Sequence, residues 1–172
     1  MGCRRHGDCH NGHARAKPMN RQEAQGIVEK AAQTFMEVDR YLLEMDLMER
    51  CIAARFAMHL QGRIHEYSVD VEYNRAGASP KTLQLADECA NRRDEFGNSL
   101  VIPDIIIHRR GPGGPNLMAI EMKKEHNAIG QQCDRLRVRA FREQLHYRYG
   151  VLMECTTGEN NPSIRIAEWL GE

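Results

Sequence analysis

The sequence predicts a mixed α/β fold, in which a small central mixed β-sheet is flanked by helices in the order α-β-β-β-α-β-β. Three observations lead to this fold class. Apolar residues recur at spacings of three and four over residues 20–61, as on one face of a helix. Apolar and polar residues then alternate over 64–75, which indicates a half-buried strand. Two apolar segments, 100–108 and 117–124, follow on either side of a loop rich in glycine and proline.

The first helical segment is defined by its apolar stripe and by its ends. Asn20 is a suitable N-terminal cap, and Gly62 stands where glycine commonly ends a helix. A break near Gly26 or Asp39 would divide the segment into two helices. The stripe consists of Phe35, Val38, Leu42, Met45, Ile52, Phe56 and Leu60.

The rest of the chain supplies the strands and a second helix. The polar residues 76–99 are expected to form a long connection with a short helix over 81–90. The apolar strand 100–108 can pair as a hairpin with strand 117–124 across the loop 109–116. A helix over 131–147, closed by Gly150, and two short strands at 151–155 and 164–169 complete the order.

Charge and composition bound the class of protein. The 172 residues carry 24 Lys and Arg and 24 Asp and Glu, and this zero net charge is unlike the basic excess of most nucleic-acid binders. The charge is unevenly distributed, because residues 105–150 hold nine basic and four acidic side chains. Since no segment is apolar enough for a membrane span or a secretory signal, we expect a cytoplasmic protein that does not associate with membranes.

The cysteines and the N-terminal segment have separate interpretations. Six scattered cysteines without a secretion signal favour reduced thiols over a disulfide scaffold. Residues 1–19 are expected to be a disordered basic tail, and residues 20–172 a single domain. The tail contains Cys3, His6, Cys9, His10 and His13, whose side chains are of zinc-ligand types, so zinc binding is its alternative interpretation.

Three charged positions interrupt the apolar pattern. Asp104 follows Pro103 inside the run Ile102–Ile107, so an edge or a bulge is expected there. Glu121 and Lys123 project from one face of their strand, because strand residues two apart share a face. That face also carries Leu117 and Ala119, whereas Met118, Ile120 and Met122 share the other.

Pairing of the two strands brings Asp104 and Glu121 together. Two neighbouring carboxylates stay ionised only with a cation between them, and their oxygens suit Mg²⁺ or Mn²⁺. Glu49, on the apolar stripe of the first helix between Met45 and Ile52, could have such a cation as its partner. The alternatives are that Asp104 is a turn residue, that Glu121 and Lys123 are an exposed ion pair, and that Glu49 lies at the edge of its stripe.

The Pro103-Asp104 pair and the Glu121-Met122-Lys123 triplet, one hairpin apart, resemble the PD-(D/E)xK motif of restriction-endonuclease-like nucleases. The resemblance covers roughly residues 40–155 and implies a restriction-endonuclease-like core. It also implies a metal-dependent hydrolysis of phosphodiester bonds. Asp104, Glu121, Glu49 and the backbone carbonyl of Met122 would hold Mg²⁺ or Mn²⁺. Lys123 would orient or activate the attacking water.

DNA is the expected substrate of such an enzyme, with RNA as an alternative, and sequence specificity would require a homodimer or a larger complex. A second hypothesis is a non-catalytic nuclease-fold module that binds nucleic acid or protein in a larger assembly. Either Asp70 or Glu72 could join the acidic cluster, and His108 is expected to be a polar residue at a strand end. The side chains expected to contact backbone phosphates are Arg109, Arg110, Lys124, Arg135, Arg139 and Arg142.

Overall fold

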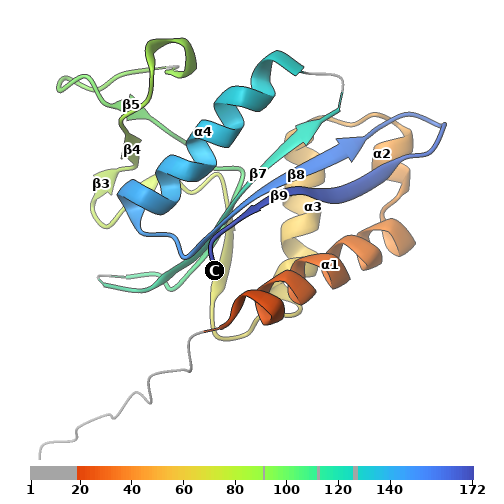
Figure 1. Ribbon diagram of the computed structural model, residues 1–172. Helices are drawn as coiled ribbons and strands as arrows, with labels where there is room; N and C mark the ends of the chain where they lie inside the picture. The colour runs from red at the N-terminus through yellow and green to blue at the C-terminus, as the bar shows by residue number, and fades with distance from the viewer. Residues whose placement is uncertain (1–18, 91, 112, 126–127) are drawn as a thin grey trace, which may run out of the picture.

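A five-stranded mixed sheet with helices on both faces forms the centre of the protein (Figure 1). The computed structural model describes residues 19–90, 92–111, 113–125 and 128–172. The sheet has the order β1-β6-β7-β8-β9, in which β7 and β8 are parallel and the other neighbours are antiparallel. Its strands are β1 (Ser68–Val71), β6 (Ile105–His108), β7 (Asn116–Lys124), β8 (Tyr149–Thr156) and β9 (Ser163–Leu170). The predicted mixed α/β class is thus confirmed.

The N-terminal helical segment is divided at Asp39, one of the two expected breaks, whereas Gly26 lies inside a continuous helix. Asn20 caps this helix through a reciprocal pair of hydrogen bonds with Glu23, and Gly62 ends the segment as predicted. None of the helices in the described ranges is long and apolar enough to cross a membrane. The helices are α1 (Arg21–Val38), α2 (Tyr41–Glu44), α3 (Glu49–Gln61) and α4 (Ala128–Leu145).

The alternation of side chains along β6 divides the core into two parts. Ile105 and Ile107 face α1 and α3 and pack in a cluster with Phe35 and Phe56. Ile106 points to the opposite face, where it packs with Phe141 of α4. Because both faces of the sheet are covered, β6 is apolar along its length up to His108.

The connection between β1 and β6 differs from the prediction. Two short strand pairs and a 3-10 helix (Asp87–Cys89) replace the helix expected over 81–90, because Thr82 and Leu83 pair with Leu100 and Ser99 instead. The predicted strand 100–108 is consequently interrupted, and β6 begins only at Ile105. The short strands are β2 (Arg75–Ala76), β3 (Ser79–Pro80), β4 (Thr82–Leu83) and β5 (Ser99–Leu100).

Two predictions about β6 and β7 were wrong, namely an edge or bulge at Pro103 and a shared face for Leu117 and Ala119. Pro103 lies just before β6, and β6 pairs on both sides, so this strand is not an edge. A register shift occurs between Ile107 and His108 instead. Because of this shift, Leu117 packs with Met118 against α1 and α3 rather than sharing a face with Ala119.

Gly150 lies in β8 and does not end α4, contrary to the prediction. The helix ends at Leu145, and His146 adopts a left-handed conformation with a φ of 56°. A Cβ atom at Gly150 would lie 2.5 Å from Cγ1 of Val138, which is closer than real Cβ contacts allow. Glycine at this position therefore allows α4 to pack closely on the sheet.

The prediction of reduced cysteines was wrong for one pair. Cys89 of the 3-10 helix and Cys133 of α4 form a disulfide, because the fold brings their Cα atoms within 5.2 Å. Cys51 and Cys155 are free thiols. The N-terminal tail with its proposed zinc ligands lies outside the described residues, apart from Met19.

Two glycine substitutions should change stability in opposite directions. Gly150→Ala should lower the free energy of unfolding by about 1–3 kcal/mol, because the added methyl group overlaps Val138. Gly26→Ala is the matched control, since nothing lies within 4 Å of its Cβ position, and it should raise stability by about 0.5–1 kcal/mol. Urea unfolding followed by circular dichroism measures both, and an unchanged midpoint for Gly150→Ala would contradict the close approach.

Candidate functional site

Asp104 and Glu121 lie opposite each other on the α4 side of the sheet. Ile105 pairs with Ile120 in an antiparallel ladder, so the register places Asp104 across from Glu121. The N–H group of Met122 donates a hydrogen bond of 2.7 Å to Oδ2 of Asp104, which fixes the carboxylate at the end of β6. The predicted meeting of the two carboxylates across the hairpin is thus present.

Glu121 is a buried carboxyl group with incomplete hydrogen bonding. Its exposed fraction is 4%, and its Oε1 has no hydrogen-bond partner among the described residues. The nearest cation is Arg137, whose Nε lies 3.9 Å from Oε2. Burial, followed by the negative charge of Asp104, raises the pKa of Glu121 well above its ordinary value.

Asp104 has the same environment in a milder form. Burial raises its pKa to about 6, and the charges of Glu49 and Asp134 contribute in the same direction. The hydrogen bond from Met122 and the charge of Arg137 act against this increase. Both carboxyl groups are therefore held where their ionised forms are costly unless further positive charge is supplied.

Lys123 lies between two other carboxylates. Its Nζ is 3.8 Å from Oε2 of Glu49 and 3.7 Å from Oδ2 of Asp134. Asp134 is almost fully buried, and burial raises its pKa, whereas Arg137 and Lys123 lower it. The group thus combines four carboxylates, namely those of Glu49, Asp104, Glu121 and Asp134, with the two cations Lys123 and Arg137.

Asp134 and Arg137 were not predicted from the sequence, although α4 carries a signal for both. Residues 134, 137, 138 and 141 follow the spacing of a single helix face, and Val138 and Phe141 on that face are buried. Charged residues on a buried helix face interrupt an apolar pattern, as Asp104 does in its apolar run.

Glu49 reaches the site from a different position than expected. It is the first residue of α3, not a residue in the middle of an apolar stripe, because the chain breaks between α2 and α3. Its Oε1 accepts a hydrogen bond of 3.0 Å from the N–H group of Lys124. Glu49 therefore ties α3 to the end of β7, while its second oxygen faces Lys123.

A cavity of about 550 Å³ opens beside the two central carboxylates. Asp104, Glu121 and Arg137 form part of its wall, and the connection between β1 and β6 forms another part. Three more cationic residues from that connection line the cavity, namely Arg75, Lys81 and Arg92. A charged ligand in this cavity would contact both the acidic pair and several cations.

Asp104 and Glu121 are the carboxylates that a divalent cation could reach from this cavity. In the described ranges, no three His, Cys, Asp or Glu side chains are grouped so as to hold a metal ion. Mg²⁺, however, commonly binds through one or two carboxylates and completes its shell with water and substrate phosphate. The unpartnered Oε1 of Glu121, next to Asp104 at the cavity wall, fits such an open site.

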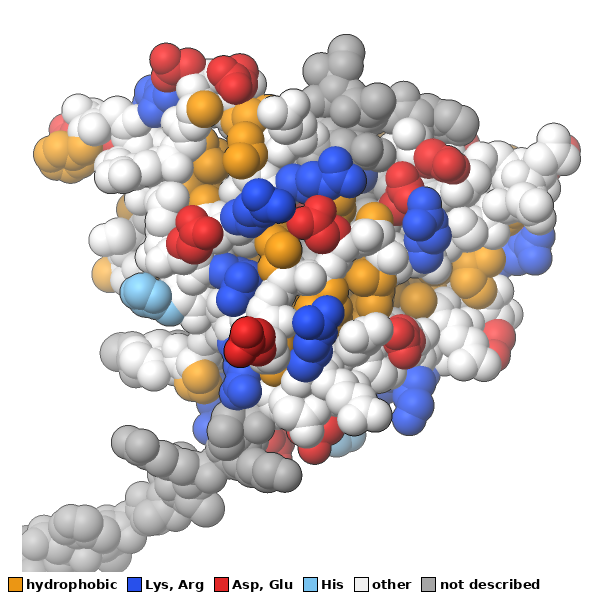
Figure 2. All heavy atoms as spheres, in the orientation of Figure 1, with side chains coloured by type: hydrophobic (Ala, Val, Ile, Leu, Met, Phe, Trp, Pro, Cys, Tyr) orange, Lys and Arg blue, Asp and Glu red, His pale blue; other side chains and the backbone are white. Residues whose placement is uncertain are grey.

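The six basic residues expected to contact phosphates do not come together. Arg110 pairs with Asp70, Lys124 with Asp46, and both Arg135 and Arg139 with Glu168. Arg109 donates to the carbonyl of Glu66, and Arg142 to that of Arg148. Figure 2 shows basic and acidic side chains interspersed on the face that it presents, rather than one continuous basic patch.

The other acidic candidates have their own partners away from the cluster. Glu72 forms an ion pair with Arg50. Asp70 forms an ion pair with Arg110 and a hydrogen bond with His108, and these contacts lower the pKa of Asp70 despite its partial burial. His108 is the last residue of β6, as expected of a polar residue at a strand end.

No protein-family model, curated protein or solved structure matches the chain.

The burial of Asp104 should make stability depend on pH. Its folded-state pKa of about 6 exceeds the ordinary value of 3.8, so the folded state binds more protons and stability falls as the pH rises between these values. Asp104→Asn keeps an oxygen for the Met122 N–H group but removes the charge. It should raise the free energy of unfolding at pH 7.5 by about 2–3 kcal/mol and have little effect below pH 4.

Urea unfolding in the presence of a chelator at both pH values measures this difference. Glu95→Gln, which removes an exposed carboxylate, is the matched control and should change stability little at either pH. A less stable Asp104→Asn variant at pH 7.5 would contradict the electrostatic cost assigned to this carboxylate.

Proposed function

We propose that this chain is a metal-dependent nuclease of the PD-(D/E)xK type, with a restriction-endonuclease-like core, that hydrolyses phosphodiester bonds. The observation that carries the proposal is the pairing of Asp104 with Glu121, whose Oε1 has no hydrogen-bond partner in the described structure. Lys123, two residues further along β7, completes the motif. The cavity beside these residues gives a substrate access to them.

Asp104 and Glu121 would hold Mg²⁺ or Mn²⁺, together with the backbone carbonyl of Met122. The side chain of Met122 packs in the core on the opposite face, so only its backbone is available to the site. Bound metal would polarise the scissile phosphate and lower the pKa of a coordinated water. Four carboxylates balanced by two cations leave a negative excess when all are ionised, and a divalent cation would neutralise it.

The two cations of the cluster have separate roles in this proposal. Lys123 is held between Glu49 and Asp134, from where its ammonium group would orient the attacking water and offset the charge developing on the phosphate. Arg137 lines the cavity next to Glu121 and would contact a phosphate oxygen. The two carboxylate oxygens of Glu49 face Lys123 and the N–H group of Lys124. In this proposal Glu49 would therefore position the end of β7 rather than bind the metal itself.

DNA remains the proposed substrate, with RNA as the alternative. The cations that line the cavity beside the acidic pair are Arg75, Lys81, Arg92 and Arg137, and none of the six basic residues predicted from the sequence lines it. Phosphate contacts of this kind give affinity but no base specificity. A homodimer or a larger complex would have to provide sequence specificity.

The second candidate function is a nuclease-fold module without catalysis. One observation favours it: within the described ranges no group of three potential ligands surrounds a metal position. In such a module the acidic cluster would serve only to join α3 and α4 to β7 through Lys123 and Lys124.

Cleavage assays with single-stranded DNA, duplex DNA and RNA distinguish the two candidates. We expect cleavage with Mg²⁺ or Mn²⁺ and none with a chelator. Glu121→Gln should abolish the activity, and Lys123→Ala should lower the rate by about 100- to 1,000-fold, as the loss of one charge-stabilising group typically does. Both variants should remain folded by circular dichroism.

Glu95→Gln serves again as the matched control, because its carboxylate is exposed and the residue does not line the cavity. It should cleave at the rate of the unmodified protein. Equal rates in chelator, or in Glu121→Gln, would refute the nuclease proposal. Metal-independent binding of nucleic acid without any cleavage would favour the non-catalytic module.

A further inference from the structure

A second cavity, of about 450 Å³, lies at the other end of β6. His108 of β6 is in its wall, together with Tyr73, Tyr147 and the β2–β3 hairpin. Arg75 and Lys81 line both this cavity and the one beside Asp104, so the two cavities share a wall. The volume is within the range of small-ligand sites.

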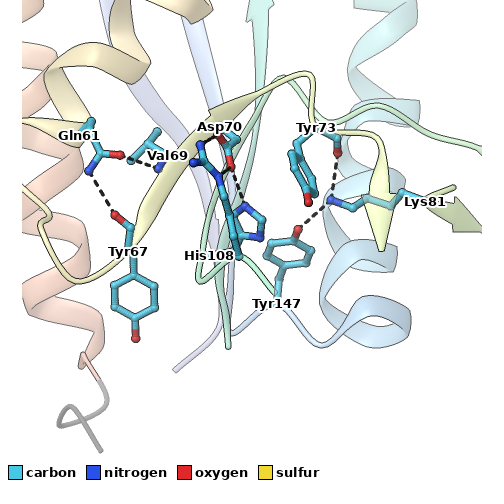
Figure 3. Close-up of polar contacts among 9 residues, drawn as sticks. Gln61, Tyr67, Val69, Asp70, Tyr73, Lys81, His108 and Tyr147 are labelled. Atoms are coloured by element: carbon cyan, nitrogen blue, oxygen red, sulfur yellow. Dashed lines mark hydrogen bonds and ion pairs between the residues drawn. The ribbon is translucent and has the colours of Figure 1, made fainter. Parts of the chain in front are cut away.

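The wall of this second cavity is cationic. Arg75, Lys81 and Arg109 contribute to it, and none of the described residues that line it is acidic. The nearby carboxylate of Asp70 is occupied by His108 and Arg110, as Figure 3 shows for His108. An anion is therefore the class of ligand that this cavity favours.

Lys81 is the most buried cation of this wall. Its exposed fraction is only 3%, and its Nζ donates to the carbonyl oxygen of Tyr73 at 3.1 Å and to the hydroxyl of Tyr147 at 3.0 Å (Figure 3). Both partners are neutral, and no carboxylate of the described residues lies within ion-pair distance of it. Burial lowers its pKa to about 8, so the group remains mainly charged at pH 7.

The aromatic residues of the wall indicate what the anion is attached to. The Lys81 ammonium lies 5.2 Å from the ring centre of Tyr73 and 5.4 Å from that of Tyr147. Tyr147 is buried against Phe141, so the partly exposed ring of Tyr73 is the surface that a planar heterocycle could reach beside the cation. A phosphate group joined to a nucleobase satisfies both conditions.

We propose that the cavity formed by Tyr73, Lys81, His108 and Tyr147 is a nucleotide-phosphate binding site, separate from the Asp104–Glu121 pair. The ligand is either a free nucleoside monophosphate or the phosphorylated end of a nucleic-acid strand, since both carry the same chemical groups. Binding requires neither a metal ion nor catalysis, so the inference does not rest on the proposed nuclease activity.

Isothermal titration calorimetry in the presence of a chelator tests the site with adenosine 5′-monophosphate, adenosine and inorganic phosphate. We expect the monophosphate to bind at least about tenfold more tightly than adenosine or phosphate. Ala76→Glu adds a carboxylate to an exposed residue of the cavity wall and should weaken binding at least about tenfold. Ala54→Glu, on the exposed surface of α3, is the matched control and should bind normally.

Lys81→Met keeps the aliphatic stem and removes the charge, and it should abolish binding in a folded protein. If this variant unfolds, Ala76→Glu alone decides. A dinucleotide with a 5′-phosphate distinguishes the sources: tighter binding than the free monophosphate assigns a strand end, and weaker binding assigns a free nucleotide.

Equal affinities for adenosine and its monophosphate, or equal effects of Ala76→Glu and Ala54→Glu, would overturn the inference. Because Glu121→Gln leaves this cavity intact, it should bind the monophosphate normally even where it abolishes cleavage. Failure of this inference and failure of the nuclease proposal therefore give different results.

Discussion

The antiparallel register of β6 and β7 is the constraint on which the candidate site depends. It places Asp104 opposite Glu121, and the sheet face on which they lie is covered by α4. In this environment burial raises the pKa of both carboxyl groups, and the charge of Asp104 raises the pKa of Glu121 further. A shift of the register by one residue would turn Glu121 toward the apolar core of α1 and α3, where no cation could reach it.

The segments around this hairpin complete the charge balance. Lys123 and Arg137 bring positive charge from β7 and α4, and Asp134 joins them to each other. Glu49 connects the N-terminus of α3 to the end of β7. Elements far apart in the sequence are thus coupled through one polar cluster, whose negative excess is the physical basis for proposing a divalent cation.

The connection between β1 and β6 forms part of the wall of both cavities. It supplies Arg75 and Lys81 to both cavities, and the Cys89–Cys133 disulfide joins it to α4. Three of the four cations that line the cavity beside the acidic pair, Arg75, Lys81 and Arg92, come from this connection. The zero net charge of the chain is therefore compatible with a cationic site, because ion pairs elsewhere, such as those of Glu168 with Arg135 and Arg139, account for much of the remaining charge.

The sequence by itself determined the order of the main elements and the meeting of Asp104 with Glu121, because hydrophobic periodicity and strand alternation are local properties. It did not reveal Asp134, Arg137 or the roles of Arg75 and Lys81, whose positions depend on how α4 and a polar connection pack on the sheet. It also suggested reduced thiols for Cys89 and Cys133, which lie 44 residues apart. Only the tertiary structure decided these features, since contacts between distant segments leave no period in the sequence.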